Sequence, residues 1–182
     1  LSRADLKAFK KDIAASEALL MQLETPVETV IAAAKIAAEA GVPVILNPAP
    51  ARKLPAELFK LLDWVTPNET EAEILTGVKV TDAASAQRAV DALVKRGVRH
   101  ALITMGSKGV YCGNCRKLYP TKKVKAVDCV AAGDTFNGAF TVALTEGKSC
   151  KDAIAFAQQA AAISVTRPGA QASVPFRKEV KN

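Results

Sequence analysis

The stretch that decides the fold is Ala126-Val127-Asp128-Cys129-Val130-Ala131-Ala132-Gly133-Asp134-Thr135-Phe136-Asn137-Gly138-Ala139. We predict a strand that Asp128 closes, a turn of small residues, and an apolar helix that Asp134 opens. Such a junction leaves backbone N–H groups at the helix N-terminus without partners in the helix, and these groups attract anions. An acid beside a phosphate-binding turn suggests phosphoryl transfer, in which the acid orients or deprotonates a hydroxyl.

The same stretch has a simpler interpretation, in which an aspartate caps a helix after a strand and the alanines serve packing. Glycine followed by aspartate is common before a helix, so the stretch alone leaves this alternative open. Asp128 and Asp134 lie six positions apart with only small or apolar residues between them. Since a cap needs only one acid, the second carboxylate argues against capping as the whole explanation.

The composition is that of a folded protein, with 182 residues, 49% hydrophobic residues and a mean hydropathy of +0.12. This length suits one ordinary domain with a substantial core. No apolar run reaches the roughly 18 to 20 residues that span a bilayer. The first residues also lack the basic-then-apolar pattern of a signal peptide. We therefore expect a cytoplasmic protein with no membrane partner.

The net charge of +7 arises from 25 basic and 18 acidic residues. The basic residues are spread out, with modest clusters at 122–125 and 177–178. Nucleic-acid-binding proteins usually show a basic stripe with interleaved aromatic residues, and this chain has none. We expect a solvated basic surface and no nucleic-acid partner, although such a surface also attracts an anionic nucleotide.

Cys112 and Cys115 have the spacing of a zinc knuckle, but a structural zinc site needs four ligands. The single histidine, His100, and the distant Cys129 and Cys150 speak against a second half-site. Gly113-Asn114 between two short β-like runs favours a hairpin turn. We expect thiols in a reducing compartment, with metal or redox chemistry as the weaker alternative.

Strands alternate with helices along the chain, which predicts an α/β fold whose mainly parallel sheet has helices on both faces. We expect a single α/β domain over residues 1–182, with Thr25 capping a helix whose first residue is Pro26. The expected strands are 18–24, 42–47, 64–66, 100–104, 110–112, 117–119 and 124–127. The expected helices are 1–15, 26–40, 55–62, 68–75, 82–96, 134–146 and 150–166.

Polar residues gather at the predicted carboxyl ends of these strands, where α/β sheets bind their ligands. We expect them to converge on one edge of the sheet, as the structural basis of an active site. They are Glu24, Asn47, Asn68, Glu71, the turn 104–107 and the stretch 128–134.

Three of these segments, in this order, resemble the ribokinase (PfkB) family of sugar kinases. They are Asn68-Glu69-Thr70-Glu71, Thr104-Met105-Gly106-Ser107-Lys108-Gly109 and the stretch 128–137, of which 131–139 is close to the family's specific C-terminal signature. The segments 19–24, 47–51 and 166–171 resemble the ribokinase members of that family. The resemblance covers essentially the whole chain.

The resemblance implies a catalytic role for the opening stretch. Asp134 would be the base that activates the primary hydroxyl of the sugar, and the backbone of Ala131, Ala132 and Gly133 would form the anion hole for the γ-phosphate. Glu24 would lie at the sugar site. Asn68 and Glu71 would serve the ATP phosphates and Mg²⁺. The nucleotide site would be lined by Thr104, Gly106 and Ser107, with Gln158 near the adenine.

The resemblance also implies a site for a monovalent cation such as K⁺ beside the anion hole, and hard oxygen ligands suit that ion. Its ligands would be the side chains of Asp128 and Ser173 and the carbonyls of Val130, Ser164, Arg167 and Gly169. For Asp128 the alternative is an acceptor that stabilises a loop. For Asn68 and Glu71 it is a helix capping box, and for Glu24 an exposed strand end. Cys129 stands where the family usually has threonine.

Members of the family are longer, and this chain resembles their C-terminal part. We expect a ribokinase-like fold that lacks the N-terminal βα units and the lid. The leading hypothesis is an ATP-dependent sugar kinase that converts D-ribose to ribose 5-phosphate and ADP, with a homodimer possible in a full-length parent. The alternatives are a truncated, non-catalytic nucleotide-binding domain, or a kinase of the same family that acts on fructose or a nucleoside.

Overall fold

The computed structural model of the chain describes residues 1–180 and divides into two compact units. The first unit comprises 1–105 and 111–118, and the second comprises 106–110 and the residues from Tyr119 onward. Whether these two units belong to one domain, as the sequence predicts, stays a prediction. None of the helices between residues 1 and 180 is long and apolar enough to cross a bilayer.

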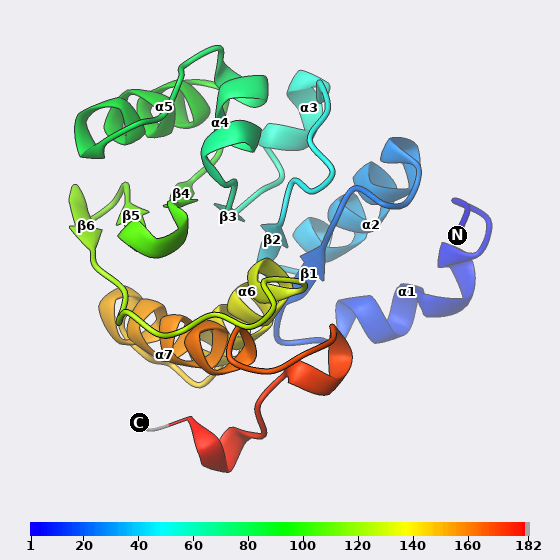
Figure 1. Ribbon diagram of the computed structural model, residues 1–182. Coiled ribbons are helices and arrows are strands. Elements are labelled where there is room, and N and C mark those ends of the chain that lie inside the picture. The colour runs from blue at the N-terminus through cyan, green and yellow to red at the C-terminus, as the bar shows by residue number, and fades with distance from the viewer. Residues whose placement is uncertain (181–182) are drawn as a thin grey trace. The chain divides into compact units, whose positions relative to one another are not determined.

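Six strands form one mixed sheet in which the spatial order follows the chain order (Figure 1). The first four strands are parallel, and Leu19 of the first pairs with Val44 of the second. The connections around the last two strands are too short for a parallel crossover, so these strands run antiparallel. The strands are β1 (Leu19–Met21), β2 (Val44–Leu46), β3 (Trp64–Val65), β4 (His100–Thr104), β5 (Val110–Cys112) and β6 (Lys117–Tyr119).

Helices α2 to α5 connect the parallel strands and pack with them into the core of the first unit. Val44 and Leu46 contribute to this core, while Ile45 and Leu102 are also fully buried. Because side chains alternate along a strand, both faces of the sheet are buried, as in other parallel sheets. The helices of this unit are α1 (Leu6–Ala14), α2 (Val27–Glu39), α3 (Ala56–Phe59), α4 (Glu69–Thr76) and α5 (Ala83–Lys95).

The predicted start of α2 was wrong by one position. Pro26 is the residue that precedes the helix, with ψ of 136°, and no side chain caps this end. Pro26 accepts the first hydrogen bonds of the helix through its carbonyl, from Thr29 N–H and Val30 N–H. Neither the residue before a helix nor its first residue needs an N–H for a hydrogen bond within the helix, so proline is tolerated at both. The sequence alone therefore does not distinguish the two positions.

The second unit is built around two antiparallel helices, α6 (Ala132–Thr145) and α7 (Cys150–Ser164). Phe140, Ala143, Ile154 and Ala157 are fully buried there. The remaining elements are the short 3-10 helices η1 (Gly106–Lys108), η2 (Gln171–Ser173) and η3 (Arg177–Glu179).

The predicted strand at 124–127 is absent, and this correction concerns the segment that leads into α6. Val127 N–H and Asp128 N–H both donate to the Val165 carbonyl, at 2.7 and 3.2 Å. A strand needs a ladder partner, and these bonds instead run to Val165, the residue that follows the last residue of α7. Val124 and Val127 are exposed, so the apolar residues that suggested a strand do not enter the core.

Candidate active site

The carboxyl edge of the parallel strands gathers the polar residues that the sequence predicted for the first unit. Backbone hydrogen bonds continue the parallel pairing past the strand ends and hold the four following loops side by side. The bonds are Leu23 N to Ala49 O (2.8 Å), Asn47 N to Met21 O (2.9 Å), Thr66 N to Leu46 O (3.1 Å) and Thr104 N to Pro67 O (2.9 Å). The predicted convergence of Glu24, Asn47, Asn68 and Thr104 is therefore confirmed within this unit.

Asn68 and Glu71 form a reciprocal capping box at the start of α4, which was the structural alternative for this pair. Asn68 Oδ1 accepts from Glu71 N–H at 2.8 Å, and Glu71 Oε2 accepts from Asn68 N–H at 2.8 Å. Asn68 also forms an isolated parallel bridge with Thr104. The box fixes the polar residues expected to serve the ATP phosphates, so a structural role and a binding role are compatible.

Two substitutions at Asn68 separate these roles. Asn68→Ala removes the cap and is expected to cost about 1 kcal/mol of unfolding free energy. Asn68→Asp keeps an acceptor for Glu71 N–H, so we expect near-normal thermal stability but weaker binding of ATP in the absence of Mg²⁺, because a carboxylate repels phosphate. Denaturant titration and ATP calorimetry on both variants check this. Equal ATP affinity in wild type and Asn68→Asp would exclude the binding role.

Glu24 lies in the loop after β1 and is exposed. It follows Leu23, which is fully buried and donates its N–H to the Ala49 carbonyl. The position of Glu24 agrees both with the sugar role implied by the resemblance and with an exposed strand end. Its role in sugar binding stays a prediction.

The turn before α6 presents the opening motif in the second unit. The helix begins at Ala132, two residues before the predicted Asp134, so Asp134 lies in its first turn and is exposed. Ala131 has a left-handed φ of 58°, and Ala132 N–H donates to Cys129 O at 3.3 Å. A Cβ built on Gly133 would meet no atom within 4 Å. This turn therefore leaves open space at the start of a helix, where an anion can approach the backbone.

Sequence reasoning missed two buried polar residues near the start of α6. Asn137 is buried and its Nδ2 donates to the Gly133 carbonyl at 2.9 Å, which braces the first turn of α6. Thr135 is also buried, and its Oγ1 has no hydrogen-bond partner among residues 1–180. The sequence signal that could have identified them is the presence of two polar residues on the buried face of an apolar helix.

Asp128 ties together two loops of the second unit that are far apart in the sequence. Its Oδ1 accepts from Val130 N–H at 2.9 Å and its Oδ2 accepts from Gly169 N–H at 3.0 Å. The loop-stabilising alternative for Asp128 is therefore confirmed. Ser173 is buried and its Oγ donates to Ala170 O at 2.7 Å. The structure thus brings Asp128 and Gly169 together, while cation binding by the predicted set stays a prediction.

These two hydrogen bonds give Asp128 a testable pH dependence. The bond from Val130 N–H, followed by that from Gly169 N–H, lowers the pKa of the Asp128 carboxyl below its ordinary value. The stabilisation is therefore present above the unfolded-state pKa of about 3.9 and is lost as the pH falls through the lower folded-state value. Carboxyl ¹³C NMR titration measures this, and Asp128→Asn identifies the resonance. Titration at or above the ordinary value would contradict the two bonds.

The other predicted nucleotide residues of the second unit have local roles. Gly106 and Ser107 lie in η1 and are exposed, and Gly106 has a positive φ of 52°. Gln158 lies on α7, and its Nε2 donates to the Tyr119 carbonyl at 2.9 Å. Their contacts with a nucleotide stay predictions.

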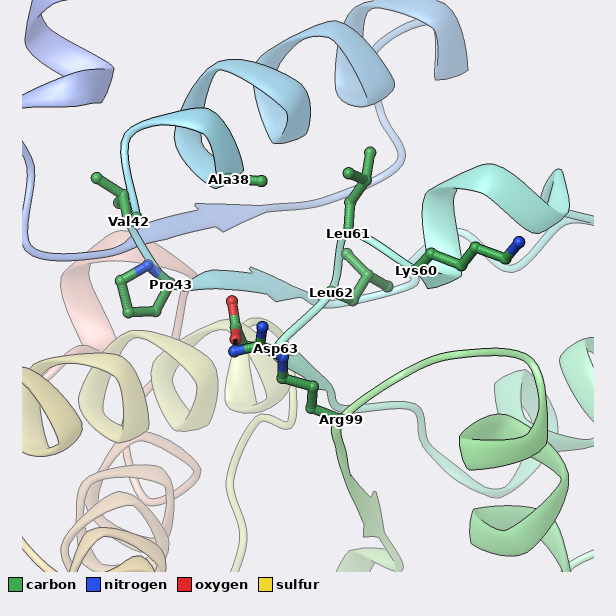
Figure 2. A pocket seen from close by; sticks show the side chains of 9 residues that line it. Ala38, Val42, Pro43, Lys60, Leu61, Leu62, Asp63 and Arg99 are labelled. Atoms are coloured by element: carbon green, nitrogen blue, oxygen red, sulfur yellow. Dashed lines mark hydrogen bonds and ion pairs between the residues drawn. The ribbon is translucent and has the colours of Figure 1, made fainter.

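A cavity of about 190 Å³ lies at the opposite, amino edge of β2, β3 and β4 (Figure 2). The Asp63 carboxylate is paired on both oxygens. Its Oδ2 accepts from Val44 N–H at 2.8 Å, and its Oδ1 accepts from Arg99 Nη1 at 2.9 Å. The cavity is lined by Ala38, Gly41, Val42, Pro43, Lys60, Leu61, Leu62, Asp63 and Arg99. It is separate from the carboxyl edge and so is not the predicted active site.

Four parallel strands joined by helices, with polar loops at their carboxyl edge, define an α/β protein. The pfkB family carbohydrate kinase pattern matches residues 3–177, and the chain belongs to that family. Among curated relatives, Ribokinase of Haemophilus influenzae is 52% identical over 181 residues, which are 98% of this chain and 59% of that protein. Ribokinase of Staphylococcus aureus (strain COL) is 42% identical over 97% of this chain and 59% of that protein.

Solved structures also show similarity to ribokinases. Ribokinase from Thermotoga maritima superposes with a TM-score of 0.85 at 44% identity, covering 93% of this chain and 57% of that chain. Arabidopsis thaliana ribokinase complexed with ribose and ATP has a TM-score of 0.89 at 36% identity, covering 98% of this chain and 58% of that chain. The predicted ribokinase-like α/β fold is confirmed. The chain spans less than two thirds of the length of these relatives.

Proposed function

We propose that the chain is the nucleotide-binding and catalytic-base part of an ATP-dependent kinase that transfers the γ-phosphate to the primary hydroxyl of D-ribose, which gives ribose 5-phosphate and ADP. The observation that carries the proposal is the start of α6, where Asp134 lies exposed in the first turn beside the open space at Gly133. The Arabidopsis relative, whose structure contains ribose and ATP, supports ribose as the acceptor.

Asp134 would accept the proton of the sugar hydroxyl, and the backbone at 131–133 would hold the transferring phosphate. Phosphoryl transfer depends on positioning and on neutralising charge more than on covalent chemistry by the protein. A helix N-terminus supplies both, because its N–H groups and its dipole favour a developing negative charge. The left-handed turn at Ala131 and the amide of Asn137 keep these N–H groups in a fixed geometry.

The residues that we propose for nucleotide binding, as the family resemblance implies, are Asn68, Glu71, Thr104, Gly106, Ser107 and Gln158. A carboxylate and an amide oxygen are ligands that Mg²⁺ accepts, directly or through water, which fits Asn68 and Glu71. When bound, Mg²⁺ would neutralise phosphate charge. We also propose a cytoplasmic site of action, where ATP is available. Homodimerisation of a longer parent stays a prediction.

A monovalent cation would be held by oxygens of the two loops that Asp128 connects. A carboxylate has about four acceptor positions, so the two N–H bonds of Asp128 leave capacity for an ion. Such an ion would stabilise the loop that precedes the anion hole. The remaining proposed ligands are the Ser173 side chain and the carbonyls of Val130, Ser164, Arg167 and Gly169.

A coupled assay of ADP release with ribose, fructose and a nucleoside as acceptors tests the activity, on the 182-residue chain and on a longer protein that contains it. We expect ribose to give the highest turnover. Mass spectrometry of the product should show one added phosphate, and ATP hydrolysis without sugar should be slow.

The principal alternative is a non-catalytic nucleotide-binding domain, which is favoured by the coverage of only 59% of the curated relatives. ATP binding by calorimetry without turnover in either protein would support that alternative. Faster turnover with fructose or a nucleoside would keep the kinase chemistry and reject ribose as the acceptor.

A further inference from the structure

The turn between β5 and β6 is fixed by close contacts within the first unit. Gly113 N–H donates to Ala101 O at 3.0 Å. A Cβ at Gly113 would lie 2.4 Å from Val90 Cγ1, so the turn backbone packs directly on α5. Asn114 Nδ2 lies 2.7 Å from His100 Nδ1 of β4. The backbone of this turn is therefore ordered before any reaction takes place there.

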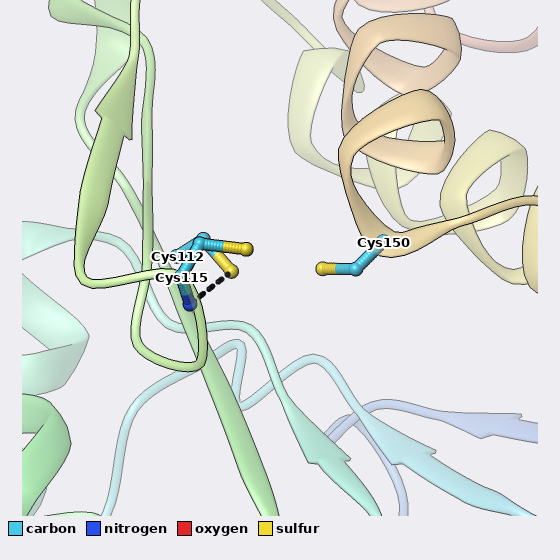
Figure 3. A group of neighbouring side chains, drawn as sticks. All are labelled: Cys112, Cys115 and Cys150. Carbon is cyan, nitrogen blue, oxygen red and sulfur yellow. Dashed lines mark hydrogen bonds between the residues drawn. The ribbon is translucent and has the colours of Figure 1, made fainter.

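This turn carries Cys112 and Cys115, and the structure confirms the hairpin that was predicted for them. Their Sγ atoms lie within 4.8 Å of each other, and Cys115 N–H donates to Cys112 Sγ at 3.4 Å (Figure 3). Both residues are thiols; Cys112 is fully buried and Cys115 is exposed. The turn thus presents one accessible sulfur and holds a second sulfur next to it.

We propose that Cys112 and Cys115 form a thiol–disulfide exchange site that takes a small-molecule disulfide, RSSR, as its oxidant. The Cys115 thiolate attacks one sulfur of RSSR, a Cys115–SR bond forms, the S–S bond of RSSR breaks, and one RSH leaves. The Cys112 thiolate then attacks Cys115 Sγ, the Cys112–Cys115 bond forms, and the second RSH leaves. The protein dithiol loses two electrons, RSSR gains them, and the two thiol protons end on the two RSH molecules.

The order of the two steps follows from exposure, because only the sulfur of Cys115 is accessible to an external disulfide. The second step is intramolecular, and the ordered turn raises its effective concentration. Closure requires the Sγ atoms to approach to about 2.05 Å, which a rotation of the exposed Cys115 side chain can provide.

Peptide mapping tests the proposal directly, since cleavage after Lys108 and Arg116 releases both cysteines in one peptide, 109–116. The chain is treated with glutathione disulfide and then alkylated with iodoacetamide. We expect peptide 109–116 to lose the mass of two hydrogens and to carry no alkyl group. The peptide 126–148, with Cys129 as its single cysteine, is the internal control and should be alkylated or carry one glutathione. Two alkyl groups on peptide 109–116, or a link from it to another cysteine, would overturn the proposal.

Variants test the roles of the two sulfurs. Cys112→Ala should trap a glutathione adduct on Cys115, whereas Cys115→Ser should slow modification of the buried Cys112 by about tenfold or more. The double variant Cys129→Ser/Cys150→Ser should still close the disulfide, and failure to do so would refute the pairing. Circular dichroism checks that each variant is folded. Because Cys112 is in the core, the wild-type peptide map decides the question if Cys112→Ala does not fold.

Discussion

Asp134→Asn is expected to lower the rate of sugar phosphorylation by about 10²–10⁴-fold, the contribution typical of a general base. Asparagine has the same shape as aspartate, so the first turn of α6 should remain intact. It cannot accept a proton at neutral pH, and the sugar hydroxyl would then react without a base. Loss of the charge from the first helical turn should cost only about 0.3–1 kcal/mol of stability.

The measurements are ribose-dependent ADP release and ATP affinity by calorimetry. We expect turnover to fall while ATP still binds, because the phosphate would be held by backbone groups. Asp152→Asn is the matched control, since Asp152 also lies in the first turn of a helix, α7, and its carboxylate accepts from Ser149 Oγ. The control should retain wild-type turnover. Undiminished turnover in Asp134→Asn would refute the proposed base.

Gly109→Ala is expected to have the largest effect on stability, roughly 2–5 kcal/mol of unfolding free energy. Gly109 precedes β5 and has φ of 113°, a conformation that disfavours any Cβ. The added Cβ would lie 2.1 Å from the Tyr119 carbonyl oxygen and 2.8 Å from the Pro120 Cα. These are backbone atoms, so no side-chain rotation relieves the collision. The loss is a large fraction of a typical domain stability of 5–15 kcal/mol.

Thermal and urea unfolding measure this loss, which corresponds to a decrease in Tm on the order of 10 °C. Gly147→Ala is the matched control, because Gly147 also has a positive φ, 76°, but its Cβ would meet no atom within 4 Å. The control should show only the strain of a left-handed alanine, about 1–2 kcal/mol. Equal losses in the two variants would mean that the close approach at Gly109 does not exist.

Much of the fold follows from local sequence signals. Apolar runs bounded by glycine or proline predict strands at 42–47 and 100–104, because such runs suit a sheet buried on both faces. The structure has these strands at 44–46 and 100–104. The pattern of Asn68 followed three residues later by Glu71 predicts the start of α4, because each side chain caps the backbone of the other. These features need only neighbouring residues, and the structure confirms them.

One wrong prediction depended on a partner that lies elsewhere in the chain, and another on a local ambiguity. The valines of 124–127 have strand propensity, but propensity does not supply a ladder, and the N–H groups of Val127 and Asp128 bond to Val165 instead. The one-residue error at Pro26 arose because proline is compatible with both positions at the start of a helix.

The candidate site was predictable where its residues follow from the order of the elements, and unpredictable where they depend on contacts between distant residues. Parallel topology places the loops after β1 to β4 at one edge, so the convergence of Glu24, Asn68 and Thr104 followed from the order of the elements. The bond from Gly169 N–H to Asp128 joins residues 41 positions apart, and no local pattern announces it. Cys112 and Cys115 showed a meaningful spacing, but only the packing of Gly113 on α5 shows that their turn is ordered.

The left-handed alanine before α6 has a consequence for how the proposed anion hole is prepared. Glycine would adopt φ of 58° at Ala131 without steric cost, whereas alanine costs about 1–2 kcal/mol in this conformation. Alanine also restricts the unfolded chain, which offsets about 0.4–1 kcal/mol of that cost. At a positive φ the strain exceeds this gain, so Ala131 adopts its conformation at a net cost in stability. The rest of the fold holds this strain in place, so the turn that begins the proposed anion hole is shaped at the folding step and not by a bound phosphate.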